Sequence, residues 1–123
     1  EEEDMAGYLA LLYDDPAQFE RLKPEEMQAI IERYRAWRIR MEGRGAVQSG
    51  YKLADGEGKV LRRRGGRTEV KDGPFGESKE VVGGYFVLRA ASYEEALSIL
   101  EDCPHLEFGA IEVRAHDPRV PRD

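Results

Sequence analysis

The spacing of hydrophobic and polar positions changes several times along the chain, and each spacing predicts an element. The apolar run Gly7–Tyr13, closed by the acidic Asp14, is too short for a helix and predicts a central strand buried on both faces. Helical spacing follows from Pro24 to Glu42, with charged residues on the opposite side and Gly43 as the stop. The apolar positions of this predicted helix are Met27, Ile30, Ile31, Tyr34, Trp37 and Met41.

The middle of the chain contains two further segments with the alternation of extended structure. Ala46–Leu53 predicts a strand with one covered face, which would carry Val47, Ser49, Tyr51 and Leu53. The polar stretch Lys59–Lys71 predicts a peripheral β-hairpin, because the paired Gly65 and Gly66 at its tip tolerate the positive φ of a tight turn.

The second half of the chain has the same strand, helix and strand order as the first. Val82–Ala90 predicts a buried strand, and Ser92 with Glu95 three residues later predicts a capping box at the start of a helix. That helix would end at Pro104 and present one apolar face, made of Ala96, Leu97, Leu100 and Cys103. The alternating segment Gly109–Ala115 predicts the last strand.

This order predicts an α+β fold, a ferredoxin-like βαββαβ sandwich with an inserted β-hairpin and both helices on one face of an antiparallel sheet. The other face would carry Tyr and Leu side chains of the first strand. Because such an apolar face is unusual on a monomer, we expect a homodimer that packs sheet against sheet. Residues 5–117 are expected to form a single domain, with residues 1–4 as an acidic extension and 118–123 as a polar tail.

Charge and cysteine content restrict the expected partners and compartment. The formal net charge is -6, and the first four residues supply four of the negative charges, so the rest is nearly balanced and attracts neither nucleic acid nor membrane. The run of Arg62, Arg63, Arg64 and Arg67 has no interleaved aromatic residue and is interpreted as a solvated hairpin. The single cysteine, Cys103, cannot form a disulfide within the chain, and we expect a cytoplasmic protein.

Common catalytic motifs are missing from the sequence. It contains no Walker-type loop, no G-x-G-x-x-G after a strand, no H-E-x-x-H and no G-x-S-x-G. Two histidines and one cysteine without ligand spacing do not predict a zinc or haem site, and no cofactor is expected, although a metal held by carboxylates alone stays open.

Candidate chemistry gathers in KDGPFGESKE, residues 71–80. The tetrapeptide from Asp72 to Phe75 favours a turn, but Asp72, Glu77 and Lys79 also bring two carboxylates and an amine within eight residues, which can push pKa values apart. His105 follows a helix C-terminus and is either a capping residue or an acid–base group.

Together these patterns give a set of candidate site residues. The expected catalytic residues are Asp72, Glu77 and His105, and the expected ligand-binding residues are Lys79, Tyr85, Glu112 and Arg114. Glu112 and Arg114 share one face of the last strand, where they form a cross-strand ion pair or line a cavity. Cys103 is interpreted as a small core residue.

Several segments resemble one family. DGPFGESKEVVGGYFVL resembles the DGPF signature of the YCII-related proteins, and YLALLY, LKPEEM, YEEAL and CPHLEFGAIEVR resemble further segments of that family in the same order. The resemblance implies a ferredoxin-like subunit of the dimeric α/β-barrel type. Some relatives carry a histidine near the start of the first helix, proposed to work with an aspartate, and Glu26 takes that place here. Bacterial genes of this type often lie beside sigma-factor genes, which implies a regulatory link.

Three functions therefore remain open. In the first, the protein is a small-molecule enzyme with proton-transfer, isomerase or lyase chemistry at the DGPF loop, where Asp72, Glu77, Lys79 and His105 converge. In the second, it is a non-catalytic dimeric module that binds a ligand or a protein such as a sigma factor. In the third, the signature has only a structural role.

Overall fold

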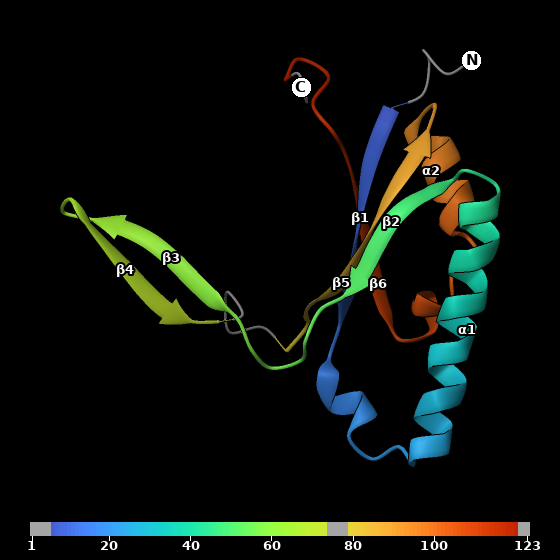
Figure 1. The fold of residues 1–123 in the computed structure, drawn as a ribbon, viewed down its shortest axis with the longest axis horizontal. Helices are drawn as coiled ribbons and strands as arrows, with labels where there is room; N and C mark the ends of the chain where they lie inside the picture. Colours follow the sequence, from blue (N-terminus) through green and yellow to red (C-terminus); the bar gives the residue numbers. More distant parts are fainter. Residues whose placement is uncertain (1–5, 74–78, 121–123) are drawn as a thin grey trace.

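Four antiparallel strands form one sheet, and two helices cover one of its faces (Figure 1). The computed structural model describes residues 6–73 and 79–120. In chain order the elements are β1 (Ala6–Asp14), η2 (Pro16–Phe19), α1 (Pro24–Gly43), β2 (Val47–Lys52), β3 (Lys59–Arg64), β4 (Arg67–Asp72), β5 (Val81–Ala90), α2 (Tyr93–Leu100), η3 (Pro104–Glu107) and β6 (Gly109–Ala115). The sheet order is β2-β5-β1-β6. This is the ferredoxin-like α+β arrangement that the sequence predicts.

The strand β1 is central, paired with β5 on one side and β6 on the other. Its burial alternates strictly, so every second residue faces the helices: Tyr8, Ala10, Leu12 and Asp14. The residues between them are only half-buried, because no helix of the described part of the chain covers the second face of the sheet. The prediction of a strand buried on both faces is therefore wrong for the single chain.

The alternation in β2 does not continue as the sequence predicts. Its register against β5 shifts between Val47 and Ser49, and the buried positions become Val47 and Gly50. Tyr51 consequently points to the uncovered face and is 68% exposed. A β-bulge adds one residue to a strand, so it exchanges the two faces beyond it.

Both helices start as predicted. Pro24 occupies the first turn of α1, and the Glu26 side chain accepts a hydrogen bond from the Lys23 N–H. In α2 the Ser92 hydroxyl accepts from the Glu95 N–H at 3.1 Å, while the Glu95 carboxylate reaches Ala91 rather than Ser92.

The inner faces of the helices meet the sheet at a single core. The buried members of this core on the helices and the segment after α2 are Trp37, Met41, Ala96, Leu100 and Cys103. Leu97, which the spacing places on the same face as these residues, is 56% exposed. The α2 helix is only eight residues long, so its buried stripe is narrow.

The strands β3 and β4 form a separate hairpin that extends away from the helices (Figure 1). Its tip is the predicted pair Gly65 and Gly66, with φ values of 57° and 78°. Positive φ at both central residues is typical of the type I′ turn that suits the twist of a two-residue hairpin. The hairpin is peripheral, as the sequence predicts.

Candidate functional site

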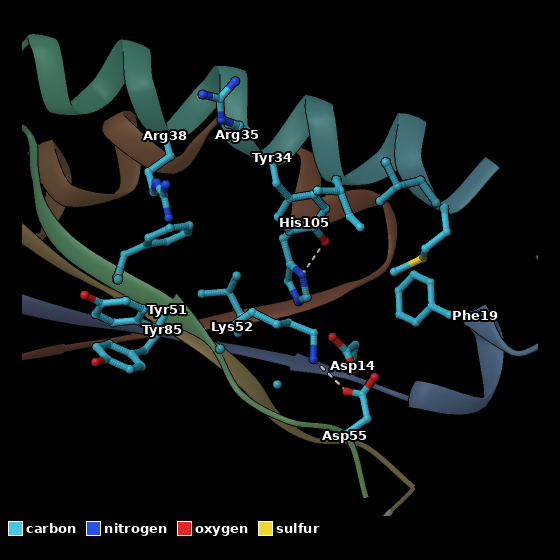
Figure 2. A pocket seen from close by; sticks show the side chains of 18 residues that line it. Asp14, Phe19, Tyr34, Arg35, Arg38, Tyr51, Lys52, Asp55, Tyr85 and His105 are labelled. Atoms are coloured by element: carbon cyan, nitrogen blue, oxygen red, sulfur yellow. Dashed lines mark hydrogen bonds and ion pairs between the residues drawn. The ribbon is translucent and has the colours of Figure 1, made fainter. Parts of the chain in front are cut away.

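A pocket of about 330 Å³ lies between the N-terminal half of α1, the ends of β1, β2 and β5, and η3 (Figure 2). Its volume is at the lower end of the range typical of small-molecule sites. The lining is largely apolar, and the side chains of α1 that contribute to it are Met27, Ile30, Ile31, Tyr34, Arg35 and Arg38. Four of the six apolar stripe positions of α1 therefore line a cavity, and one of them, Tyr34, also packs against the core.

His105 is a buried wall of this pocket, with 1% of its surface exposed. Its Nε2 lies 2.8 Å from the Tyr13 carbonyl oxygen, and its Nδ1 lies 2.8 Å from the Tyr34 hydroxyl. A carbonyl oxygen only accepts, so Nε2 carries the hydrogen. In the neutral ring, Nδ1 then accepts from the Tyr34 hydroxyl. Both ring nitrogens are thus occupied by the protein, and His105 fixes the position of Tyr34.

Asp14 is the buried carboxyl group of the same pocket, with 6% of its surface exposed. Its Oδ1 has no hydrogen-bond partner among the described residues. Burial raises the pKa of Asp14 above its ordinary value, and the nearby His105 and Lys52 only partly oppose this effect. A buried carboxylate oxygen without a donor is costly to maintain, so this group is poorly explained by the fold alone.

Gly83 of β5 makes room for the Asp14 carboxylate. A Cβ atom at this position would lie 2.9 Å from Asp14 Oδ2 and 3.3 Å from Oδ1. Any other residue would push the carboxylate out of its place. The two glycines that the sequence places before Tyr85 are therefore part of the pocket wall.

Two cations, Lys52 and Arg38, line the pocket at different places (Figure 2). Lys52 pairs with Asp55, with Nζ 2.7 Å from Oδ1, so this cation is already balanced. Arg38 extends from α1 toward the sheet, whereas the guanidinium of Arg35 points away from it (Figure 2). The Arg38 Nε is buried and has no hydrogen-bond partner among the described residues. Glu42 is its ion-pair neighbour, at 3.6 Å.

The structure brings two of the predicted site residues near one another. His105 and Tyr85 both line the pocket. Tyr85 is opposite Leu11 and Tyr51 in the sheet, so its ring lies on the face away from the helices and its backbone contributes the wall.

Two predicted residues of the DGPF stretch, Asp72 and Lys79, do not line the pocket. Asp72 is the last residue of β4, and its carboxylate pairs with Lys59 Nζ at 2.6 Å, with 87% of its side chain exposed. Lys79 is exposed, and neither residue lines the pocket. Glu77 lies outside the described residues. The structure therefore does not bring Asp72 or Lys79 to His105.

Glu112 and Arg114 are on the uncovered face of the sheet, opposite Leu11 and Leu9. Glu112 accepts a hydrogen bond from the Tyr13 hydroxyl at 2.8 Å. This bond raises the pKa of Tyr13. Both β6 residues are exposed and neither lines the pocket.

Sequence reasoning missed Asp14 and Tyr34 as site residues. A signal for Asp14 was available, because it continues the in-facing positions Tyr8, Ala10 and Leu12 by one more step of two. Sequence reasoning interpreted it only as the end of an apolar run. Tyr34 meets His105 from 71 residues away, and nothing in the local pattern indicates that contact.

Other reactive groups are less suited to chemistry. Burial raises the pKa of the Cys103 thiol to about 11, so it is not a thiolate at neutral pH.

Among the described residues, no group of three or more His, Cys, Asp or Glu side chains is arranged to hold a metal ion. Within the same described ranges, no helix is both long enough and apolar enough to cross a membrane.

Comparison with known proteins gives the family. The YCII-related domain matches residues 6–116 of the chain. An uncharacterized protein of Rhizobium meliloti (strain 1021) is 40% identical over 57 residues, a match that spans 45% of this chain and 46% of that protein. The domain match extends from the start of β1 to the residue after β6, and the chain therefore belongs to the YCII-related family.

Proposed function

We propose that the pocket binds a small organic molecule and that Asp14 transfers a proton to or from it. One observation carries this proposal: a buried carboxylate in a pocket wall has a raised pKa and an oxygen with no hydrogen-bond donor among the described residues. Enzymes raise carboxyl pKa values by burial so that the group can take up and release a proton near neutral pH. A proton-transfer or isomerase reaction fits this arrangement.

Tyr34 and His105 supply a second polar group in the pocket. In the neutral state, the Tyr34 hydroxyl donates to His105 Nδ1, while Nε2–H donates to the Tyr13 carbonyl. The Tyr34 oxygen can then still accept a hydrogen bond from a ligand hydroxyl or N–H group in the pocket.

This proposal moves the chemistry from the DGPF stretch to the pocket between α1 and the sheet. The support is geometric, because Asp14, Tyr34 and His105 share one pocket and Asp72 is exposed on the hairpin. Glu26, at the place where relatives carry a histidine, caps α1 and does not line the pocket. The carboxylate and the imidazole of this site therefore come from β1 and η3.

Deuterium exchange tests the proposal. Carbon acids that raise the melting temperature of the protein are first found in a thermal-shift screen of small carbonyl compounds. Proton NMR in D2O then follows deuterium incorporation with the wild type, with Asp14→Asn and with Asp117→Asn, a matched change at an exposed carboxylate paired with Arg119. We expect exchange with the wild type and Asp117→Asn but not with Asp14→Asn. Ligands that bind without any exchange would make the pocket a binding site only.

The uncovered face of the sheet supports a second proposal, a homodimer. Half-buried apolar residues from β1 and β5 gather there without a helix over them, among them Leu9, Leu11, Tyr13, Tyr85 and Val87. Burying such a face against a second copy removes apolar surface from water. Light scattering at micromolar concentration should give twice the mass of the chain, and a monomer would contradict this proposal.

A further inference from the structure

The pocket has two chemically different ends. Phe19 packs on Phe108 with ring centroids 5.5 Å apart and closes the end near the start of α1, beside Met27. Arg38 is at the other end, and Figure 2 shows Phe19 and Arg38 on opposite sides of Tyr34 and His105. Met27 and Arg38 are eleven residues apart on one helix, which corresponds to roughly 16 Å along its axis. A cavity of about 330 Å³ that extends over this length is narrow.

The positive charge of Arg38 is incompletely balanced by the protein. The other cation of the pocket, Lys52, already forms an ion pair with Asp55. Burial raises the pKa of Asp14, which disfavours its negatively charged form. Glu42 Oε2 is 3.6 Å from Arg38 Nε, too far for a hydrogen bond. The buried Nε–H is thus left without an acceptor among the described residues. Arg38 lines the pocket with 39% of its side chain exposed, so a ligand carboxylate would pair with the exposed part of the guanidinium rather than with the enclosed Nε. Guanidinium and carboxylate groups match in geometry and charge.

We infer that the ligand is an elongated monocarboxylate whose carboxylate pairs with Arg38 and whose apolar body lies along α1 toward Met27 and Phe19. The inference deepens the proposed function and rests on the same pocket. In this orientation the carbon skeleton passes Tyr34 between the two ends, and the carboxylate is held away from the buried Asp14. The molecule that is bound is therefore anionic at one end and apolar at the other.

Calorimetric titration at neutral pH tests this inference with defined probes: butanoate, hexanoate, 3-phenylpropanoate and the uncharged 3-phenylpropanamide. The wild type should bind hexanoate more tightly than butanoate, by about three- to fourfold for each added CH2 group. It should bind 3-phenylpropanoate at least about tenfold more tightly than the amide, which lacks the charge. Equal affinity for the acid and its amide would overturn the inference, as would a wild type that binds none of the three carboxylates.

Two arginine variants test whether Arg38 is the residue that gives the preference for the carboxylate over the amide. Arg38→Gln should remove the preference for the carboxylate, whereas Arg40→Gln should keep it, because Arg40 is on the same helix, pairs with Asp102 and does not line the pocket. A preference that survives in Arg38→Gln contradicts the inference. Circular dichroism of both variants shows whether each is folded, and a second variant, Arg38→Lys, should restore part of the preference if the first folds poorly.

The Asp14→Asn variant separates this inference from the proposed function. It should still bind 3-phenylpropanoate, because the substitution removes a negative charge and leaves Arg38 in place. Tight binding of carboxylates without deuterium exchange by the wild type would contradict proton transfer and retain the ligand class. Deuterium exchange of uncharged carbonyl compounds by the wild type, without any preference for carboxylates, would contradict the ligand class and retain proton transfer.

Discussion

The two halves of α1 carry the same apolar stripe but use it differently. In the C-terminal half, Trp37 and Met41 are each 2% exposed and belong to the core. Nearer the N-terminus, from Met27 to Tyr34, the stripe residues Met27, Ile30 and Tyr34 are only half-buried and line the pocket. The same helical spacing therefore places side chains in the core at one end of α1 and in the pocket wall toward the other. Periodicity alone predicts the helix but does not show where its apolar side faces a cavity.

Truncation of the two halves should give the sharpest contrast. Trp37→Ala removes a buried ring that packs on Phe86 and donates to Asp102 at 2.9 Å, and it should lower the free energy of unfolding by about 3–5 kcal/mol. Met27→Ala should cost under about 1 kcal/mol, because the side chain is already partly solvated. Urea unfolding of both variants measures the difference. A comparable loss from both would mean that the N-terminal half also belongs to the core.

Gly83→Ala should have the next largest effect. The new Cβ would overlap the Asp14 carboxylate, and such overpacking typically costs about 1–3 kcal/mol. Gly43→Ala is the matched control, since its Cβ would meet nothing within 4 Å at the end of α1. Thermal unfolding should show a lower melting temperature for Gly83→Ala and an equal or higher one for Gly43→Ala. If Gly83→Ala is neutral, the carboxylate is not held in the position described.

Asp14→Asn should stabilise the protein at neutral pH. An uncharged amide avoids the cost of a buried negative charge, and removing such functional strain commonly adds about 0.5–2 kcal/mol. Asp117→Asn should instead give no gain, because hydrogen bonds from Arg119 lower the pKa of that carboxylate in the folded state. Urea unfolding compares the two variants. Destabilisation by Asp14→Asn would assign Asp14 a structural role.

The pH dependence of the stability difference between Asp14→Asn and the wild type tests the direction of the Asp14 pKa shift. Because folding raises the pKa of Asp14 above its ordinary value of 3.8, its contribution to stability is greatest below that value and is lost as the pH rises through the folded pKa. The stability difference between Asp14→Asn and the wild type should therefore grow with pH over this window and then level off. A difference that is constant with pH would contradict the raised pKa.

The smallest effect is expected on the hairpin. Asp72 pairs with Lys59 at the surface, where ion pairs contribute about 0–1 kcal/mol. Asp72→Asn should leave both the melting temperature and the binding of 3-phenylpropanoate nearly unchanged. Loss of binding in this variant would return the candidate site to the DGPF stretch.

Much of the fold follows from local sequence signals. Pro24 and Gly43 delimit α1, Gly65 with Gly66 sets the hairpin turn, and Ser92 starts α2, because each acts on its own backbone neighbours. The bulge in β2 does not follow from such signals. It depends on how Val47 and Gly50 pair with β5, a contact that alternation of residue types does not encode.

The site is less accessible to sequence reasoning because its members meet only in the folded chain. Tyr34 Oη and the Tyr13 carbonyl reach His105 from 71 and 92 residues away. The DGPF motif is the clearest local signal and predicts Asp72 as a site residue, but Asp72 is on an exposed hairpin. His105 was identified from its chemistry, whereas Asp14 required the knowledge that its strand position faces the pocket.

Titration of the Asp14 carboxyl carbon by 13C NMR, in the protein without ligand, tests most directly whether Asp14 can transfer a proton in the pocket. We expect a midpoint above 3.8, because burial raises the pKa and Oδ1 has no hydrogen-bond partner among the described residues. A midpoint at or below 3.8 would show that the carboxylate is stabilised by the fold, and would contradict its assignment as the proton-transferring group of the pocket.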